Sequence, residues 1–439
     1  MKRDKAQAIF ERAAKVIPAG VNSNFRYWGP EETPVMSQAK GPYIWDADGN
    51  RYIDYRLGWG PIILGHSYPA VVERVAEAMQ HGTVFAATTE LEVQVAERLV
   101  RMVPGVDLVR FANSGAEATM HALRLARAHT NREKFIKFEG QYHGMYDYAL
   151  FSTAGANLDV IGSRRNPIPQ QMSSGIPKGI REYVVTLPFN DFEMVGKTVK
   201  ETWGDLAAIM VEPVLGNVAG IEPEPGFLEH LRALCDEYGI VLIMDEVKTG
   251  FRVANGGAQE VYGVLPDIAT YAKGMGNGFP VAAFGGKKEV MDTLVPGQVS
   301  HGGTYTANTV GMAAADAVLE LLETQPILDT IARRGQRLRS GLDEILSDAG
   351  VPHIMTGLPA MQGFIVGDVP VKELRDLKNH DDDFYDTVMM NLFELGVWAE
   401  ADAREPWFLC YDHDDAIIDE TLNKFEDALR KTISDTGGS

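Results

Sequence analysis

Short apolar runs alternate with helix-periodic segments between Leu108 and Leu322, and this alternation constrains the fold more than any other feature of the sequence. Strands that are joined by helical crossovers pair in parallel, and parallel sheets are buried on both faces. The apolar centres of the runs agree with such burial. We therefore predict an α/β fold with a mostly parallel, seven-stranded sheet. The predicted strands are Leu108–Ala112, Lys134–Phe138, Tyr183–Leu187, Ala207–Val211, Ile240–Met244, Ile268–Tyr271 and Val281–Gly285.

The chain has a different pattern on either side of this region. Apolar residues recur at helical spacing over Asp4–Val16, and two β-prone runs then flank Asp48-Gly49, a dipeptide typical of tight hairpins. Beyond Gln325, long helical patterns accompany a few strand-like pieces. These features predict a smaller α+β domain built from both ends of the chain. The predicted divisions are an N-terminal segment of the small domain over residues 1–65, a large domain over 66–325 and the C-terminal small domain over 326–439.

The charge balance and the cysteine content disfavour several classes of protein. The 439 residues include 41 lysines and arginines against 61 aspartates and glutamates, a formal net charge of −20, which disfavours partners such as nucleic acid or an anionic membrane. Cys235 and Cys410 are the only cysteines, and no zinc-ligand spacing surrounds them, so we expect neither a disulfide framework nor a metal site. Because the N-terminus lacks a signal-peptide pattern and no apolar run is long enough to span a membrane, we expect a cytoplasmic protein.

One internal stretch does not fit the alternating pattern. Residues 157–181 are interrupted by glycines and prolines, and the stretch is too long for a simple connection between two elements. We predict that it forms a mobile flap.

Two charged positions follow apolar runs and are candidates for chemistry. Asp245 and Glu246 come directly after Ile240–Met244, and ligands of open α/β sheets gather at the carboxyl ends of strands. Lys273 follows Ile268–Tyr271 and precedes a glycine-rich stretch, and burial there would lower its pKa and make the amine a nucleophile. For Asp245, the alternatives are an aspartate that caps a loop and the magnesium-binding acid of a nucleotide hydrolase. For Lys273, the alternative is a surface lysine. The hydrolase alternative lacks a complete phosphate-binding loop.

A third candidate lies where a predicted helix begins after Leu108–Ala112. The free N–H groups at that point, together with the Ser114 hydroxyl, would bind a phosphate monoester, although serine is also a routine helix N-cap. Pyridoxal phosphate requires an amine for its aldehyde, a carboxylate for its ring nitrogen and donors for its phosphate. Lys273, Asp245 and Ser114 supply these three groups, so the sequence indicates this cofactor.

Six short motifs in this order resemble those of the class III (ω-type) aminotransferases, which are pyridoxal-phosphate enzymes of fold type I. The resemblance covers most of the chain, and it implies that the large domain binds the cofactor. The motifs are Asn113–Ala118, Tyr142–Gly144, Val211–Val214, Met244–Arg252, Ala272–Gly274 and Gly302–Asn308.

The resemblance also implies roles for individual residues. Lys273 would form the Schiff base with the cofactor, and Asp245 would hold the ring nitrogen. The phosphate would bind Ser114, Gly115 and Ala116, the ring would lie between Tyr142 and Val247, and Glu212 would hydrogen-bond within the site. His143, next to Tyr142, is either a general base or a hydrogen-bonded structural histidine. Such sites form at a homodimer interface, where Thr304 would reach the phosphate of the neighbouring subunit.

Within this family the chain most resembles the glutamate-1-semialdehyde aminomutase branch. Arg26 corresponds there to a position that binds a substrate carboxylate, while Trp59 is an aromatic neighbour that would suit an apolar amine. The chain departs from the branch at Arg404, which either binds a second carboxylate or pairs with Glu405, and at Asn277, where glycine is usual. The motifs of this branch are Val21–Ser23, Gly58–His66, Thr89–Glu92 and Ser174–Pro177.

Together these features predict an aminotransferase that moves an amino group between a small amine or amino acid and a carbonyl acceptor. The enzymatic alternative is an aminomutase or epimerase, which needs no external acceptor. A non-enzymatic, cofactor-binding relative is the third possibility, and the presence of Lys273 disfavours it. The sequence leaves the substrate and its stereochemistry open.

Overall fold

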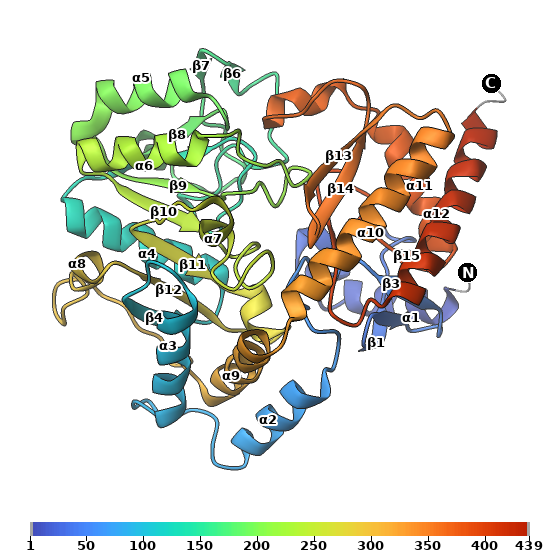
Figure 1. The fold of residues 1–439 in the computed structure, drawn as a ribbon, viewed down its shortest axis with the longest axis horizontal. Coiled ribbons are helices and arrows are strands. Elements are labelled where there is room, and N and C mark those ends of the chain that lie inside the picture. Colours follow the sequence, from blue (N-terminus) through green and yellow to red (C-terminus); the bar gives the residue numbers. More distant parts are fainter. Residues whose placement is uncertain (1–2, 437–439) are drawn as a thin grey trace.

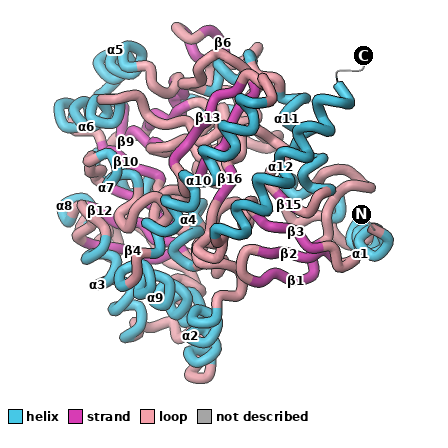
Figure 2. The backbone as a smooth tube through the Cα atoms, turned by 45° about the vertical axis from the view of Figure 1, so that its right-hand side comes forward, coloured by secondary structure: helices cyan, strands magenta, loops and turns pink. Residues whose placement is uncertain are grey.

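A central sheet with helices on both faces forms the larger part of the molecule (Figures 1 and 2). The computed structural model describes residues 3–436. The sheet has seven strands in the order β4-β12-β11-β10-β9-β5-β8. Neighbouring strands are parallel except around β12, which runs antiparallel to both β4 and β11. The predicted α/β fold and the seven predicted strands are therefore confirmed, with ends that shift by at most one residue. The strands are β4 (Leu108–Ala112), β5 (Lys134–Phe138), β8 (Val184–Leu187), β9 (Leu206–Val211), β10 (Val241–Asp245), β11 (Ile268–Tyr271) and β12 (Ala282–Gly286).

Both faces of the sheet are covered, which explains why its strands are apolar throughout. Successive side chains of a strand point to opposite faces, so that Ala208 and Met210 pack against α4 while Ile209 and Val211 belong to the core on the other face, beneath α6. Helices α2 and α3 pack against α9 at one side of the sheet. The helices are α2 (Pro69–Met79), α3 (Glu90–Met102), α4 (Gly115–Thr130), α5 (Phe192–Thr202), α6 (Phe227–Tyr238), α7 (Ala258–Tyr262), α8 (Lys288–Met291) and α9 (Thr309–Thr324).

Both ends of the chain contribute to one smaller sheet. Its order is β1-β2-β3-β15, in which β15 from the C-terminal part pairs in parallel with β3. The predicted hairpin at Asp48-Gly49 is confirmed as the turn between β2 and β3. The predicted divisions at residues 65 and 325 stay predictions. These elements are β1 (Met36–Lys40), β2 (Tyr43–Asp46), β3 (Arg51–Asp54), β15 (Val397–Trp398), and the helices α1 (Asp4–Ala14), α10 (Ile327–Asp348), α11 (Asp382–Glu394) and α12 (Asp415–Thr436).

The remaining elements are short. A three-stranded sheet in the order β13-β14-β16 contacts α10, and β6 pairs with β7 inside the stretch predicted to be a flap. They are β6 (Gly162–Ser163), β7 (Asn166–Pro167), β13 (His353–Leu358), β14 (Met361–Val366), β16 (Trp407–Phe408), and the 3₁₀ turns η1 (Pro18–Gly20), η2 (Asn24–Arg26), η3 (Lys178–Tyr183), η4 (Trp203–Asp205), η5 (Lys273–Gly276) and η6 (Leu374–Asn379). In the described part of the chain, no helix combines the length and the apolar character that crossing a membrane requires.

Ion pairs attach the predicted flap to the rest of the molecule. The Arg375 guanidinium donates to both carboxylate oxygens of Glu139 at 2.7 Å and to the backbone oxygen of Gly162 at 2.7 Å. Arg164 within the flap pairs with Glu373 at 3.1 Å. Because Glu139 is fully buried, its bond to Arg375 is well shielded from solvent. The mobility of the flap stays a prediction.

Asn277, where glycine was expected, links the N-terminal segment to the large sheet. Its backbone is left-handed, with φ of 43°, a conformation that asparagine tolerates better than most residues. The side-chain oxygen accepts hydrogen bonds from the N–H groups of Ile63 and Leu64, both at 2.9 Å, and the amide nitrogen donates to Gly65 at 3.0 Å. Asn277 therefore adopts the left-handed backbone conformation that usually favours glycine, and its side chain adds three tertiary hydrogen bonds.

Candidate active site

Two adjoining cavities lie where strands β9, β10 and β11 end. The inner cavity has a volume of about 240 Å³ and the outer one about 440 Å³, and four side chains border both. These shared residues are Tyr142, Asn217, Lys248 and Lys273. The inner cavity brings together most of the predicted cofactor residues, namely Ser114, Gly115, Ala116, Tyr142, His143, Glu212, Asp245, Val247 and Lys273.

Asp245 is the last residue of β10, and three neighbours orient its buried carboxylate. One oxygen accepts hydrogen bonds from the Thr270 hydroxyl and the Val247 N–H, each at 3.1 Å, and the other lies 2.7 Å from His143 Nδ1. His143 is also buried, and its Nε2 atom has no hydrogen-bond partner among residues 3–436. A carboxylate held in this way at a cavity wall can stabilise a cation there. His143 touches Asp245 directly, which agrees with a positioning role.

Lys273 begins η5 immediately after β11, and its side chain reaches the boundary between the two cavities. Burial, followed by the charge of Lys248, lowers the pKa of Lys273 to about 7. An appreciable fraction of the amine is therefore uncharged near neutral pH, as a nucleophile or a base requires. The backbone φ of Lys273 is 44°, a left-handed conformation that is costly for lysine and is typical of functional positions. Lys273 is thus partly buried at the cavity wall, and its predicted role stays a prediction.

Helix α4 points its N-terminus at the inner cavity. Ser114 is the N-cap, because its hydroxyl accepts a hydrogen bond from Glu117 N–H at 3.2 Å, so the capping interpretation of this serine is confirmed. Gly115 allows the helix to approach Val247 closely, since a Cβ at this position would lie 3.0 Å from both Val247 methyl groups. The unpaired N–H groups of a first helical turn attract anions. The phosphate role of Ser114, Gly115 and Ala116 stays a prediction.

Glu212 joins two loops beneath the cavities. One carboxylate oxygen accepts a hydrogen bond from Tyr142 N–H at 2.6 Å, and the other accepts one from Gly216 N–H at 2.9 Å. The Gln141 side-chain amide exchanges two further hydrogen bonds, both of 2.9 Å, with the Glu212 backbone. Burial raises the pKa of Glu212. Glu212 therefore fixes Tyr142, which the family resemblance places on one face of the cofactor ring.

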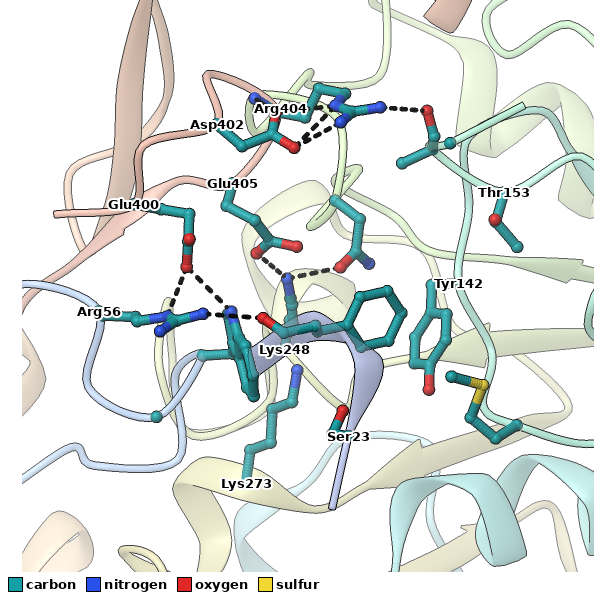
Figure 3. A pocket seen from close by; sticks show the side chains of 17 residues that line it. Ser23, Arg56, Tyr142, Thr153, Lys248, Lys273, Glu400, Asp402, Arg404 and Glu405 are labelled. Carbon is teal, nitrogen blue, oxygen red and sulfur yellow. Dashed lines mark hydrogen bonds and ion pairs between the residues drawn. The ribbon is translucent and has the colours of Figure 1, made fainter. Parts of the chain in front are cut away.

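Three cation–carboxylate pairs line the outer cavity (Figure 3). Arg56 pairs with Glu400 at 2.5 Å and stacks on Trp59, whose ring centroid lies 4.3 Å from the guanidinium carbon. The Trp59 indole N–H also donates to Glu400 at 3.1 Å. Lys248 pairs with Glu405 at 2.8 Å. In every pair the carboxylate comes from the segment 400–405, which brings three acidic side chains to one wall.

The third pair joins Arg404 to Asp402, and it contradicts one of the two roles that the sequence suggested for Arg404. Arg404 was expected either to bind a carboxylate of the substrate or to pair with Glu405. It pairs instead with Asp402 at 2.5 Å and donates to the backbone oxygen of Ala154 at 3.1 Å. The alternative of an Arg404–Glu405 ion pair is therefore wrong. The reason is local, since the Glu405 carboxylate is bound to Lys248 on another side of the segment.

Two predicted site residues lie elsewhere. Arg26 is exposed and lines neither cavity, although its neighbour Phe25 lines the outer one. Thr304 is exposed on a separate groove of about 970 Å³. The substrate role of Arg26 and the phosphate role of Thr304 stay predictions.

Sequence reasoning also missed residues that the structure places in the outer cavity. Lys248 lies inside the quoted motif Met244–Arg252, and its position three residues after Asp245 was the available signal. Arg56 and Glu400 gave no such signal, because each is one of many charged residues and the two meet only in the folded chain. Asn217, which borders both cavities, follows the motif Val211–Val214 but was not singled out.

The chemistry of the inner cavity fits pyridoxal phosphate. A lysine with a lowered pKa borders it, a buried carboxylate lies in its wall, and a helix N-terminus opens onto it. These are the groups that an aldehyde, a protonated ring nitrogen and a phosphate monoester require. His143 Nε2, which has no hydrogen-bond partner within the described residues, leaves room for a further polar contact in the completed site.

Comparison with known proteins agrees with this geometry. The family "Aminotransferase class-III" matches residues 28–429. A glutamate-1-semialdehyde 2,1-aminomutase of Desulfatibacillum aliphaticivorans is 40% identical over 98% of this chain and 100% of its own length. A solved ω-transaminase from Sphaerobacter thermophilus shares 34% identity and 97% coverage of both chains with a TM-score of 0.90. Another structure, described as a transaminase with PLP bound, shares 28% identity and 99% coverage of both chains with a TM-score of 0.89. The chain therefore belongs to the class III aminotransferase family.

Proposed function

We propose that this chain is a pyridoxal-phosphate-dependent aminotransferase that moves an amino group from a carboxylate-bearing amine or amino acid to a keto acid or aldehyde. The observation that carries the proposal is the position of Lys273, whose amine borders both the inner and the outer cavity. A lysine there can contact the cofactor on one side and the substrate on the other. Its lowered pKa, about 7, suits proton transfer at neutral pH.

In the proposed enzyme the inner cavity holds the cofactor. Ser114, Gly115 and Ala116 bind the phosphate at the start of α4, and Asp245 keeps the proton on the ring nitrogen. Tyr142 and Val247 contact the two faces of the ring, and His143 and Glu212 position Asp245 and Tyr142. Pyridoxal phosphate, when bound, supplies the aldehyde that captures an amine and a ring that accepts the electrons released by proton removal.

The protein's own contribution to the reaction is proton transfer and orientation. The uncharged Lys273 Nζ atom takes the proton from the amine-bearing carbon of the donor and delivers it at the end of the half-reaction. The His143 contact at 2.7 Å keeps the Asp245 carboxylate directed toward the ring nitrogen.

The outer cavity is the proposed substrate site. Arg56 and Arg404 supply guanidinium groups that are suited to a carboxylate, while Phe25 and Trp59 supply aromatic contact area. Since both arginines are already paired with carboxylates, a substrate carboxylate must share or displace such a partner. Arg26 and Glu405 remain proposed substrate residues on the family resemblance alone.

An aminomutase is the second candidate, and the 40% identity to a glutamate-1-semialdehyde 2,1-aminomutase over nearly the whole chain favours it. The holoenzyme is assayed with an amine donor and with or without pyruvate or 2-oxoglutarate. We expect product only when an acceptor is present, with one acceptor consumed for each donor. Glutamate-1-semialdehyde serves as the parallel substrate. Its complete conversion without any acceptor would contradict the aminotransferase and establish the mutase.

We also propose that the active enzyme is a homodimer. Thr304 lines an exposed groove outside its own cofactor cavity, so a phosphate that it contacts would belong to a second subunit. Phe85 and Tyr305, with 50% and 62% exposure, present aromatic surface at this face.

Light scattering is expected to give twice the chain mass of 48.2 kDa. Phe85→Asp is expected to shift the mass toward one chain and to weaken cofactor retention, because a buried unpaired carboxylate is costly. Val369→Asp changes an exposed apolar side chain on another surface and is the control. A monomeric and fully active wild-type protein would contradict the proposal.

A further inference from the structure

Lys248 occupies an unusual position in the site, because it is a second lysine that borders both cavities beside Lys273 (Figure 3). Its residue is only 7% exposed. The Nζ atom donates to the backbone oxygen of Gly216 at 2.5 Å, to Asn217 Oδ1 at 2.9 Å and to Glu405 Oε2 at 2.8 Å. An ammonium group has three donors and no acceptor, so these contacts use all of its hydrogens. Lys248 is therefore held as a cation with a fixed orientation.

The surrounding backbone is shaped to admit this side chain. A Cβ atom at position 216 would lie 2.3 Å from Lys248 Cδ, so only glycine leaves room for the lysine to pass. The ammonium also lies 5.5 Å from the centroid of the Phe408 ring, a favourable cation–π distance. Because an ammonium can only donate, it fixes the Asn217 amide with its oxygen toward Lys248. The Asn217 Nδ2 atom then has no hydrogen-bond partner in the described part of the chain.

The Lys248 charge acts on Lys273. Figure 3 shows Lys273 and Lys248 in the same pocket, and both residues border the inner as well as the outer cavity. A neighbouring cation disfavours protonation of an amine, whereas neighbouring carboxylates favour it. The groups that act on the Lys273 charge are Lys248, which opposes protonation, and Glu405, Glu212 and Asp245, which promote it.

We propose that Lys248 is a positioning residue, whose fixed positive charge keeps the Lys273 amine uncharged and whose hydrogen bonds orient Asn217 and Glu405 between the two cavities. The inference rests on the proposed function, since it assigns a role in tuning the amine that the reaction uses. In this arrangement the Lys248 charge acts against the three carboxylates, which favour a proton on Lys273. Burial is the largest cause of the lowered Lys273 pKa, about 7, and the Lys248 charge is the second.

The test measures the titration of Lys273 in the full-length chain without cofactor or substrate. Acetic anhydride labels uncharged amines, and mass spectrometry of the peptide that contains Lys273 gives the labelled fraction at each pH. Lys248→Met keeps an unbranched side chain and removes the charge. We expect the Lys273 midpoint to rise by about one pH unit or more, which lowers the uncharged fraction at pH 7 roughly fivefold, from about a half to about a tenth.

Two further variants make the result specific. Glu405→Gln removes a carboxylate and is expected to shift the midpoint in the opposite direction. Arg404→Met removes a cation that lines the same cavity but is bound to Asp402, and it is expected to leave the midpoint within about 0.3 pH units.

An unchanged Lys273 midpoint in Lys248→Met would overturn the inference and leave Lys248 with a packing role only. Lys248→Gln, which retains a hydrogen-bond donor, replaces Lys248→Met if that variant does not fold, and the same shift is expected. The labelling needs no substrate. An unchanged Lys273 midpoint would therefore not affect the outcome of the acceptor-dependence experiment. Conversely, acceptor-independent turnover would contradict the proposed aminotransferase without altering the Lys273 titration.

Discussion

Lys273→Ala is expected to lower kcat by a factor on the order of 10³ or more, because the substitution removes both the covalent anchor and the proton-transfer group. The steady-state rate with an amine donor and a keto-acid acceptor measures the loss. The variant should still fold, since alanine relieves a buried amine and leaves the neighbouring strand β11 intact. It should also retain some cofactor noncovalently through the α4 N-terminus and Asp245.

Lys288→Ala is the matched control for this experiment. Lys288 is an exposed lysine that pairs with Asp292 one helical turn away and lines neither cavity, so its removal should leave kcat unchanged. If Lys273→Ala kept more than about a tenth of the wild-type rate, the proposed role of Lys273 would be wrong.

Asp245→Asn is expected to lower kcat by roughly 10²- to 10⁴-fold while changing the fold little. A carboxylate holds a proton on a ring nitrogen by charge, whereas a neutral amide of the same shape does not. The contacts from Thr270 and Val247, both 3.1 Å to one carboxylate oxygen, can still be made by an amide oxygen. The measurement is kcat together with the visible spectrum of the holoenzyme, which reports the protonation of the ring system.

Glu246→Gln is the matched control for Asp245→Asn. Glu246 is buried, but its carboxylate accepts hydrogen bonds from the N–H groups of Ala258 and Gln259, both at 2.8 Å, at the start of α7. It lines neither cavity, so Glu246→Gln should leave kcat within about twofold of wild type. Equal losses in both variants would mean that the effect of Asp245→Asn comes from disturbing the end of β10.

The cofactor end of the site could be predicted from sequence because its determinants are local. Asp245 and Lys273 each directly follow or end an apolar run, and Ser114 stands between a strand and a helix. Since β10 and β11 are parallel neighbours, their carboxyl ends meet at one edge, and residues at those ends come together. Hydrophobic periodicity thus located the strands to within one residue, and with them the positions of Asp245 and Lys273 at the strand ends.

The substrate end could not be predicted in the same way. The pair between Arg56 and Glu400 joins residues from opposite ends of the chain, and the sequence offers many other charged residues for each. Arg26 was preferred on resemblance, yet it is exposed, while Arg56 is packed between Trp59 and Glu400. Likewise, Arg404 and Glu405 are adjacent in sequence but find partners on different elements.

By itself, then, the sequence determined the parallel sheet, the order of its strands along the chain and the family to which the chain belongs. The tertiary structure alone decided which carboxylate neutralises which cation around the outer cavity. The physical reason is that apolar periodicity and helix starts are encoded within a few residues. An ion pair between distant segments depends on how those segments dock, which the packing of the whole chain decides.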